Sequence, residues 1–329
     1  MRGTCRGRGL ATRGLAVAAA AGGLLLGLSA SAQGQFITAI TKPTFGLNNP
    51  DVYNVNTSTG ASTFLFNADF IPASAPGFGG LAADEPNRRL FGTVRNGAQD
   101  DLYALDYDTL TPTLLATIRR PGTTTGMAVD GLAYDSLRGA LYATRVLGGT
   151  SGAEALFRVD VATGDTSVVL EYEPTTTSNF TIGAIDYDPQ TDRIYLVDED
   201  DTGGRNIYRV DPSAATPVLD FVTALPLPIT DVDGLAAGDG KLYLVSDGPD
   251  IPGTTTIEGN GGNHYVYDIA GNSFSILGPT PYPEYNNSSL GRINPSAAGA
   301  YAPGIPEPAL LAPVALAALA GLRSRRRAD

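Results

Sequence analysis

Residues 130–170 contain four short apolar runs separated by polar turns. The runs are rich in Val, Leu, Tyr and Phe and the turns in Gly, Asp and Thr, which is typical of strands rather than helices. Within residues 155–160, Phe157 and Val159 alternate with Leu156, Arg158 and Asp160, the period expected where the two faces of a sheet pack differently. The pattern predicts strands at residues 131–134, 140–145, 155–160 and 166–170.

The same pattern returns along the chain. Gly80, Gly131, Gly183 and Gly234 each begin a first strand, at intervals of 51, 52 and 51 residues. In every copy a second strand follows, and then a third strand that ends in Asp. A repeat of this length made of four short strands is typical of a β-propeller, whose blades pack side by side around an axis. The sequence therefore predicts an all-β propeller.

The two ends of the repeat region supply a fifth unit. Residues 36–40, 51–55 and 62–66 form the second, third and fourth strands of a blade that lacks its first strand. Residues 288–293, one period after Gly234, can supply that strand. A ring closed by strands from both termini leaves no free sheet edge at the junction. We predict five four-stranded blades over residues 33–293.

A short apolar helix is expected at the start of the chain. Residues 1–32 contain four arginines, an apolar run at 15–28 and the small-residue site formed by Ala30 and Ala32. This order is typical of a secretory signal peptide cleaved after Ala32 by signal peptidase. The alternative is a membrane anchor, but the run is shorter than the ~20 residues that a spanning helix needs.

The composition limits the chemistry of the exported part. Cys5 is the only cysteine and lies inside the predicted signal peptide, so the mature chain has no disulfide and no thiolate metal site. The two end segments hold eight of the 22 basic residues and two of the 34 acidic ones, which leaves the domain near −18. This charge disfavours nucleic acid and anionic membranes as partners. It suits contact with divalent cations or hydrated polysaccharide, or serves solubility alone.

The far end of the chain carries a second set of signals. After a predicted flexible linker, residues 294–304, come Pro306, Glu307 and Pro308, then an apolar run at 309–322 and an arginine cluster at 323–327. Motif, apolar run and basic cluster in this order resemble the PEP-CTERM sorting signal. The resemblance covers residues 305–329.

The resemblance has implications for location and partners. It implies that an exosortase, a membrane protease and transpeptidase, recognises Pro306, Glu307 and Pro308. It also implies export by a Gram-negative bacterium to the cell envelope, the cell surface or an extracellular matrix containing exopolysaccharide. Pro313 interrupts the apolar run, which departs mildly from the pattern. The alternative is an ordinary tail anchor with its cationic end left in the cytoplasm.

Loop lengths favour one face of the ring for binding. The connections between second and third strands are expected to be long: 41–50, 94–100, 146–154, 198–205 and 246–263. The turns at the opposite face are short. Because binding residues tend to lie on long loops held by a rigid scaffold, we expect the ligand on the long-loop face.

Two aspartates are candidates for chemistry on that face. Asp130 and Asp233 each precede a Gly-Leu pair that begins an innermost strand, near the mouth of the central channel. Two carboxylates facing one cavity can act as acid and base on a glycosidic bond, or hold a cation. The alternative is that each caps a turn by accepting backbone N–H groups.

An acidic loop is a candidate calcium site. Asp198, Glu199, Asp200 and Asp201 offer several oxygen ligands ahead of a Gly-Gly pair, but they lack the ligand spacing of an EF-hand. The alternative is a solvated acidic loop without a metal.

The sequence contains no set of catalytic residues that fixes an activity. His264 is the only histidine, so a hydrolase triad would have to be forced around this one residue, and a histidine-rich zinc site cannot form. The repeat resembles propeller repeats of the NHL and quinoprotein-like kind, and a fold does not choose a function. The sequence favours a non-enzymatic surface or matrix protein that binds polysaccharide or another envelope component. The alternative is a calcium-assisted hydrolase of glycans or phosphate esters that uses Asp130 and Asp233.

Overall fold

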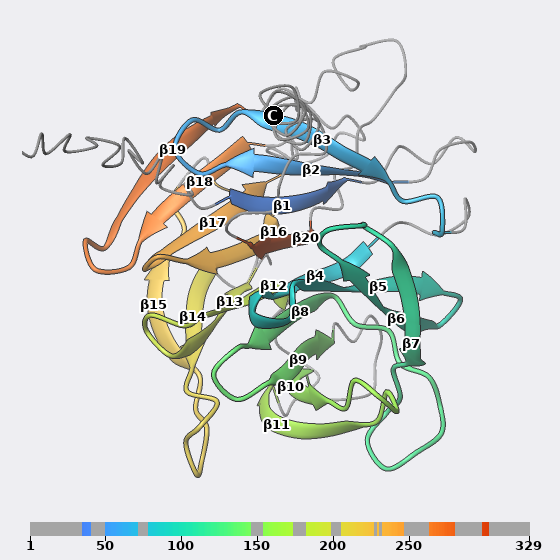
Figure 1. Ribbon diagram of the computed structural model, residues 1–329. Helices are drawn as coiled ribbons and strands as arrows, with labels where there is room; N and C mark the ends of the chain where they lie inside the picture. Colours follow the sequence, from blue (N-terminus) through green and yellow to red (C-terminus); the bar gives the residue numbers. More distant parts are fainter. Residues whose placement is uncertain are drawn as a thin grey trace, which may run out of the picture. The chain divides into compact units, whose positions relative to one another are not determined.

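The described part of the chain is a ring of antiparallel sheets. The computed structural model describes residues 35–40, 50–71, 78–145, 154–173, 182–198, 205–226, 229, 232–246, 263–279 and 298–302. These residues form five sheets of four strands each (Figure 1). The expected all-β propeller with five blades is therefore confirmed.

Each blade is one sheet, and its four strands follow one another from the axis outward. Blade 1 is β20 (Ala298–Tyr301), β1 (Gln35–Ile40), β2 (Asp51–Asn56) and β3 (Ser62–Asn67). Blade 2 is β4 (Phe78–Asp84), β5 (Arg89–Asn96), β6 (Gln99–Asp106) and β7 (Pro112–Thr117). Blade 3 is β8 (Gly131–Asp135), β9 (Ala140–Arg145), β10 (Glu154–Val159) and β11 (Thr166–Glu173). Blade 4 is β12 (Ile182–Asp188), β13 (Arg193–Asp198), β14 (Asn206–Val210) and β15 (Asp220–Ala224). Blade 5 is β16 (Val232–Gly238), β17 (Lys241–Ser246), β18 (Asn263–Asp268) and β19 (Ser273–Pro279).

Glycines let the inner strands come close together at the axis. Strands β4, β8, β12, β16 and β20 contact one another in a closed circuit. A Cβ placed on Gly80 would lie 2.7 Å from the backbone nitrogen of Leu132, and one on Gly299 would lie 2.8 Å from the carbonyl oxygen of Leu235. Any side chain at these positions would push neighbouring blades apart.

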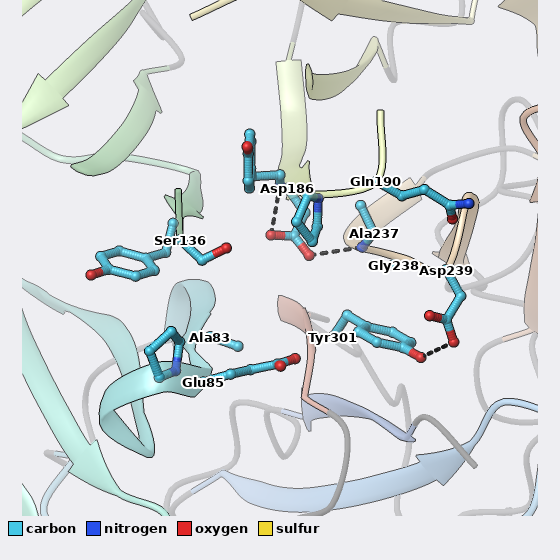
Figure 2. Close-up of a pocket in the computed structure, with 13 residues that line it drawn as sticks. Ala83, Glu85, Ser136, Asp186, Gln190, Ala237, Gly238, Asp239 and Tyr301 are labelled. Atoms are coloured by element: carbon cyan, nitrogen blue, oxygen red, sulfur yellow. Dashed lines mark hydrogen bonds between the residues drawn. The ribbon is translucent and has the colours of Figure 1, made fainter. Parts of the chain in front are cut away.

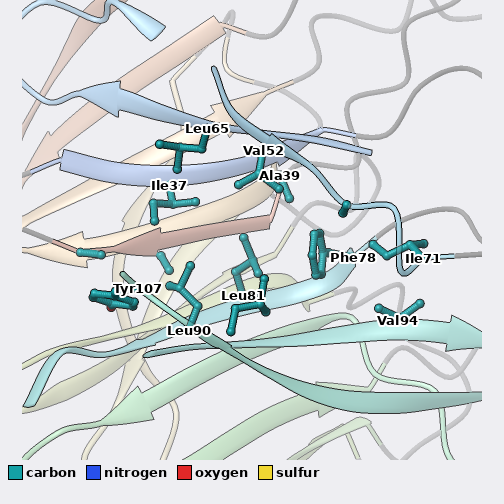
Figure 3. Packing of buried hydrophobic residues seen from close by; sticks show 14 residues of the cluster. Ile37, Ala39, Val52, Leu65, Ile71, Phe78, Leu81, Leu90, Val94 and Tyr107 are labelled. Atoms are coloured by element: carbon teal, nitrogen blue, oxygen red, sulfur yellow. The ribbon is translucent and has the colours of Figure 1, made fainter. Parts of the chain in front are cut away.

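Apolar side chains fill the space between neighbouring blades. Figure 3 shows the interface between blades 1 and 2, where Ile37 and Val52 face Leu81 and Leu90. The next residue, Phe91, points to the other side of β5 and packs against blade 3. Both faces of a blade are therefore buried, and each fully buried Leu or Phe contributes roughly 1.5–3 kcal/mol.

A repeated turn explains why the third strands end in Asp. The Asp106 side chain accepts N–H groups of Asp108 and Thr109, at 3.0 and 2.8 Å. Asp160 does the same one blade later, with Ala162 and Thr163 at 2.9 and 3.0 Å. Such Asx turns reverse the chain without needing a special backbone conformation at the first residue.

The strand that closes the ring differs from the one expected. Residues 288–293 lie outside the described residues, and β20 occupies the inner position of blade 1. Strand β20 pairs antiparallel with β1 through residues 36–39, and Ala300 and Ala302 are fully buried. The expected linker at 294–304 therefore contains a core strand. Its small residues, Ala-Gly-Ala, resemble linker composition but fit the crowded axis.

One loop expected to be long is a tight hairpin. Strands β5 and β6 pair as far as Asn96 and Gln99, so only Gly97 and Ala98 form the turn. Gly97 adopts a φ of 68° at the first of the two turn positions, where hairpins of this length favour glycine. The other four connections expected to be long fall largely outside the described residues, as do both expected terminal helices. No helix within the described ranges is long and apolar enough to cross a membrane.

His264 is a core residue of blade 5. Its side chain is fully buried and lies against Phe36 of blade 1, with ring centroids 5.2 Å apart. Burial lowers the pKa of His264 from 6.5 to about 3. The folded state therefore holds this imidazole neutral over a pH range in which the unfolded chain protonates it.

Removal of β20 should open the ring. A chain ending at residue 297 loses the strand that covers β1, so we expect its free energy of unfolding to fall by roughly 3–6 kcal/mol relative to a chain ending at 304. Urea unfolding of the two chains measures this. The matched change replaces residues 288–293 with Gly and Ser, and a larger loss there than on removing β20 would contradict the assignment of the closing strand.

His264 should make the fold sensitive to acid. Because the folded-state pKa lies below the unfolded value, the stability from neutral His264 is present above pH 6.5 and is lost as pH falls toward 3, by up to about 1.4 kcal/mol per pH unit. In urea unfolding, the advantage of the wild type over His264→Gln should shrink by about 2.5 kcal/mol between about pH 7 and pH 4.5. Parallel curves would contradict this.

Candidate functional site

A cavity of about 460 Å³ lies where the inner strands end, on the face of the short turns. Each of the five blades contributes to its wall. Its polar lining side chains come from Glu85, Tyr134, Ser136, Asp186, Tyr187, Gln190, Asp239 and Tyr301 (Figure 2). We call this cavity the funnel. It lies opposite the face that loop lengths favoured, whose loops are mostly outside the described residues.

The turns around the funnel repeat a buried aspartate in three blades. Asp84, Asp135 and Asp188 end the inner strands of blades 2 to 4 and are fully buried. Asp135 accepts the N–H groups of Leu137 and Arg138, both at 3.0 Å. Each aspartate pairs across its hairpin with the first residue of the next strand, around a four-residue turn.

Blade 5 breaks this repeat. Gly238 takes the place of the capping aspartate and pairs with Lys241 around a two-residue turn. A Cβ on Gly238 would lie 2.3 Å from the ring of Tyr301, so only glycine leaves room for that ring. The following residue, Asp239, adopts a φ of 53° and is exposed at the funnel.

Tyr301, the last residue of β20, is fixed on the funnel floor. Its hydroxyl donates a hydrogen bond of 2.5 Å to Asp239 Oδ2. Its ring stacks on Tyr243, with centroids 5.9 Å apart and planes 16° from parallel. Burial and the bond to Asp239 raise the pKa of Tyr301, so its hydroxyl keeps its proton at neutral pH.

Asp186 joins three blades beneath the funnel. Its carboxylate accepts the N–H groups of Ala237 in blade 5 and of Tyr187 in its own strand, both at 2.8 Å. The N–H of Tyr301 in blade 1 also bonds to it. Burial raises the pKa of Asp186 well above its usual value, despite these donors. The contacts fix the relative positions of the strands that carry the funnel walls.

Glu85 reaches into the funnel from blade 2. It begins the short 3₁₀ turn η1 (Glu85–Asn87), and Figure 2 shows its carboxylate extending toward Tyr301 and Asp239. Although Glu85 is exposed as a whole residue, partial desolvation of its carboxyl group in the cavity, followed by the negative charge of Asp239, raises the pKa of Glu85 to about 7. At neutral pH this carboxyl is therefore divided between its charged and uncharged forms.

The aspartates predicted as a catalytic pair lie at the other end of the axis. Asp130 and Asp233 both line the axial opening, as expected, but the opening measures only about 10 Å³. That volume is close to the minimum that holds one water molecule. An Arg95 nitrogen lies 3.7 Å from Asp130 Oδ1. The described residues therefore leave room for about one water molecule there, while most of the long loops expected on this face are outside them.

Asp100 holds the segment that presents Asp130. It is fully buried, and its carboxylate accepts the N–H of Val129 at 2.7 Å and an N–H of Arg95 at 2.6 Å. Burial raises the pKa of Asp100 to about 6. These contacts give Asp100 and Arg95 a role in positioning the chain at the axis.

The remaining predicted sites are mostly outside the described residues. Asp198 is fully buried at the end of β13, while Glu199, Asp200 and Asp201 are outside, so the proposed calcium loop is only partly in view. Ala30, Ala32, Pro306, Glu307 and Pro308 are also outside. Within the described ranges, no three His, Cys, Asp or Glu side chains are placed to hold a metal ion.

The sequence pattern does not indicate the funnel. Tyr301 falls within the expected linker, and Glu85 and Asp239 fall within turns that are expected only to be short. The signal available in the sequence is the irregular hairpin of blade 5, where Gly-Asp-Gly stands in place of an aspartate and a longer turn.

Comparison with known proteins returns propellers at low similarity. No protein-family profile and no curated protein sequence matches the chain. TolB from Acinetobacter baumannii is 13% identical with a TM-score of 0.44, over 75% of this chain and about half (53%) of that one. A chain of a nidogen–laminin complex is 14% identical with a TM-score of 0.47, over 75% of this chain and 80% of that one. A 6-phosphogluconolactonase-like protein from Bacteroides uniformis is 14% identical with a TM-score of 0.38, over 76% and 68%. Similarity this low carries no argument about function, and the sheet topology alone identifies the chain as a five-bladed β-propeller.

Proposed function

We propose that this protein is an exported propeller of the cell envelope or extracellular matrix, and that it binds a polysaccharide or another hydroxyl-rich envelope component in the funnel. In this role the protein binds its ligand without cleaving it. It combines the export and sorting signals expected from the two ends of the chain with the chemistry of the one cavity of ligand size that the described residues enclose along the axis.

The size and lining of the funnel support a carbohydrate ligand. A volume of about 460 Å³ lies in the range of small-molecule sites. The half-buried ring of Tyr301 provides apolar surface for the CH groups of a sugar, beside the nearly buried rings of Tyr134 and Tyr187, while Gln190 and Asp239 provide polar atoms for its hydroxyls. Carboxylates and amides at fixed positions beside aromatic rings suit a ligand that is polar at its edges and apolar on its faces.

The irregular hairpin of blade 5 is the observation that carries the proposal. Three blades use a buried aspartate to close this turn, and stability alone would favour the same solution in blade 5. The chain has Gly238 at this position instead. Without a side chain there, the turn has no aspartate cap, and the ring of Tyr301 packs against Gly238 and bonds to the exposed Asp239. Departures from a repeat that form a polar group at a cavity mark functional positions more often than structural ones.

Loss of Tyr301 should abolish glycan binding. We expect Tyr301→Ala and Gly238→Ala, which displaces the Tyr301 ring, each to weaken binding of exopolysaccharide fragments from the host by about tenfold or more. Isothermal titration calorimetry on the mature chain measures the affinity, and a reducing-end assay on the same samples detects cleavage.

Two matched variants complete this experiment. Gly97→Ala makes the same substitution at a positive-φ turn with open space around it, and should leave binding unchanged. Asp130→Asn tests the opposite face and should also bind normally. New reducing ends that disappear in Asp130→Asn or Asp233→Asn would replace this proposal with the hydrolase alternative.

Export and sorting can be tested separately in the host. We expect the mature protein to begin at Gln33, as measured by intact mass, and replacement of Pro306, Glu307 and Pro308 by Ala to leave the C-terminal segment attached. A mature chain that retains residues 1–32 would contradict the signal-peptide assignment. Tail processing that is unaffected by the triple replacement would contradict the sorting assignment.

A further inference from the structure

The charged side chains that line the funnel are all acidic. Its lining includes the carboxyl groups of Glu85, Asp186 and Asp239, and none of its lining residues is Lys, Arg or His. Asp186 is occupied by the backbone N–H groups of three strands. Glu85 and Asp239 remain as two acidic side chains at the open part of the cavity.

The arginines nearest the funnel already have acidic partners of their own. Arg89 pairs with Asp84 at 2.6 Å, and Arg138 pairs with Asp135 and Asp192, both at 2.7 Å. Arg88, next to the η1 turn, pairs with Asp108 at 2.5 Å. Among the described residues, no ion pair is formed by Glu85 or by Asp239.

We infer that the ligand of the funnel carries a primary amine, as in a glycan with free amino sugars, whose ammonium group lies between Glu85 and Asp239. This inference rests on the proposed function, because it names the class of glycan that the same cavity selects. An ammonium group donates three hydrogen bonds, and Glu85 and Asp239 can accept them while Tyr301 keeps Asp239 in place. The same two carboxylates disfavour uronic acids and phosphorylated sugars.

The arrangement suits an ammonium group better than a metal ion. The three carboxyl groups come from blades 2, 4 and 5 and lie on separate walls of the cavity (Figure 2). A metal ion requires several ligands within about 2–2.6 Å of one point, and among the described residues no three acidic side chains are placed to provide them. An ammonium group needs no complete shell, since it can donate single hydrogen bonds of about 2.8 Å to either carboxylate. The half-buried ring of Tyr301 can then contact the sugar ring that carries the amine.

Binding of an amine should release a proton from the funnel. The ionisable groups that face Glu85 are Asp239 from the β16–β17 turn, Tyr301 from β20, and Tyr107 from its own blade. Asp186 from β12 is also near, since its charge acts on Tyr107. Arg88, whose charge also acts on Tyr107, is already paired with Asp108, so an ammonium group brings an additional positive charge to Glu85. It stabilises the charged form of Glu85, whose pKa of about 7 then falls.

The experiment compares glucosamine oligomers with their N-acetylated counterparts of equal length. At about pH 7 we expect the free-amine oligomer to bind the mature chain about tenfold more tightly or better. In calorimetry, the observed enthalpy should depend on the ionisation enthalpy of the buffer, which reports proton release from Glu85 less the protons taken up by amines that are uncharged in the free oligomer. An anionic oligogalacturonate should bind more weakly than either.

Variants separate a specific site from general attraction to an acidic protein. Glu85→Gln with Asp239→Asn should reduce the ratio of free-amine to N-acetylated affinity to less than about threefold and remove the contribution of Glu85 to the buffer dependence. Asp69→Asn with Glu171→Gln removes the same charge from exposed positions outside the funnel and should preserve the preference. Equal effects of the two double variants would overturn the inference, since the attraction would then be non-specific.

The outcomes also distinguish this inference from the proposed function. Equal or tighter binding of the N-acetylated or a neutral oligomer, still lost in Tyr301→Ala, would overturn the amine inference and leave the funnel as a glycan site. Binding of every oligomer that is insensitive to Tyr301→Ala, or no binding at all, would overturn both.

Discussion

Every blade of this protein has apolar side chains on both faces, and this constraint governs the whole ring. Leu90 packs toward blade 1 while Phe91, the next residue, packs toward blade 3. A blade standing alone would leave both of these surfaces in water, at a cost of roughly 25 cal/mol for each Å² exposed. Five separate apolar clusters in the described residues correspond to five interfaces between blades, so the sheets stabilise one another only as a closed set.

The funnel exists because the ring is held together differently at one end of its axis. Asp186 uses a single buried carboxylate to fix strands of blades 4, 5 and 1. The hairpin of blade 5, next to this carboxylate, has no capping aspartate of its own. Gly238 and Asp239 are then available to hold Tyr301 and to present a carboxylate, so the structural support and the candidate site use the same few residues.

The sequence was sufficient to predict the fold, because the repeat places glycines and strand-forming runs at a nearly constant interval. Strand β9 was predicted with its observed bounds, residues 140–145. The closing strand was harder, since Ala-Gly-Ala has neither bulk nor β-branching, and its strand conformation depends on pairing with residues more than 250 positions earlier. The funnel could not be predicted either, because it also depends on pairing between distant residues. Tyr301 reaches Asp239 only after this distant pairing has formed, and no local pattern in the sequence records it.

The position of β20 near the end of the chain also determines which blade is completed last. Strand β1 is among the first parts of the propeller to leave the ribosome, and its inner neighbour is the last. Four blades can form in succession as the chain emerges, but blade 1 remains a three-stranded sheet with an open edge until residue 302 is free. The chain therefore cannot reach its final form until β20 is free to pair with β1. Ring closure and completion of the funnel floor by Tyr301 are then one event, so an incompletely folded molecule has no finished site.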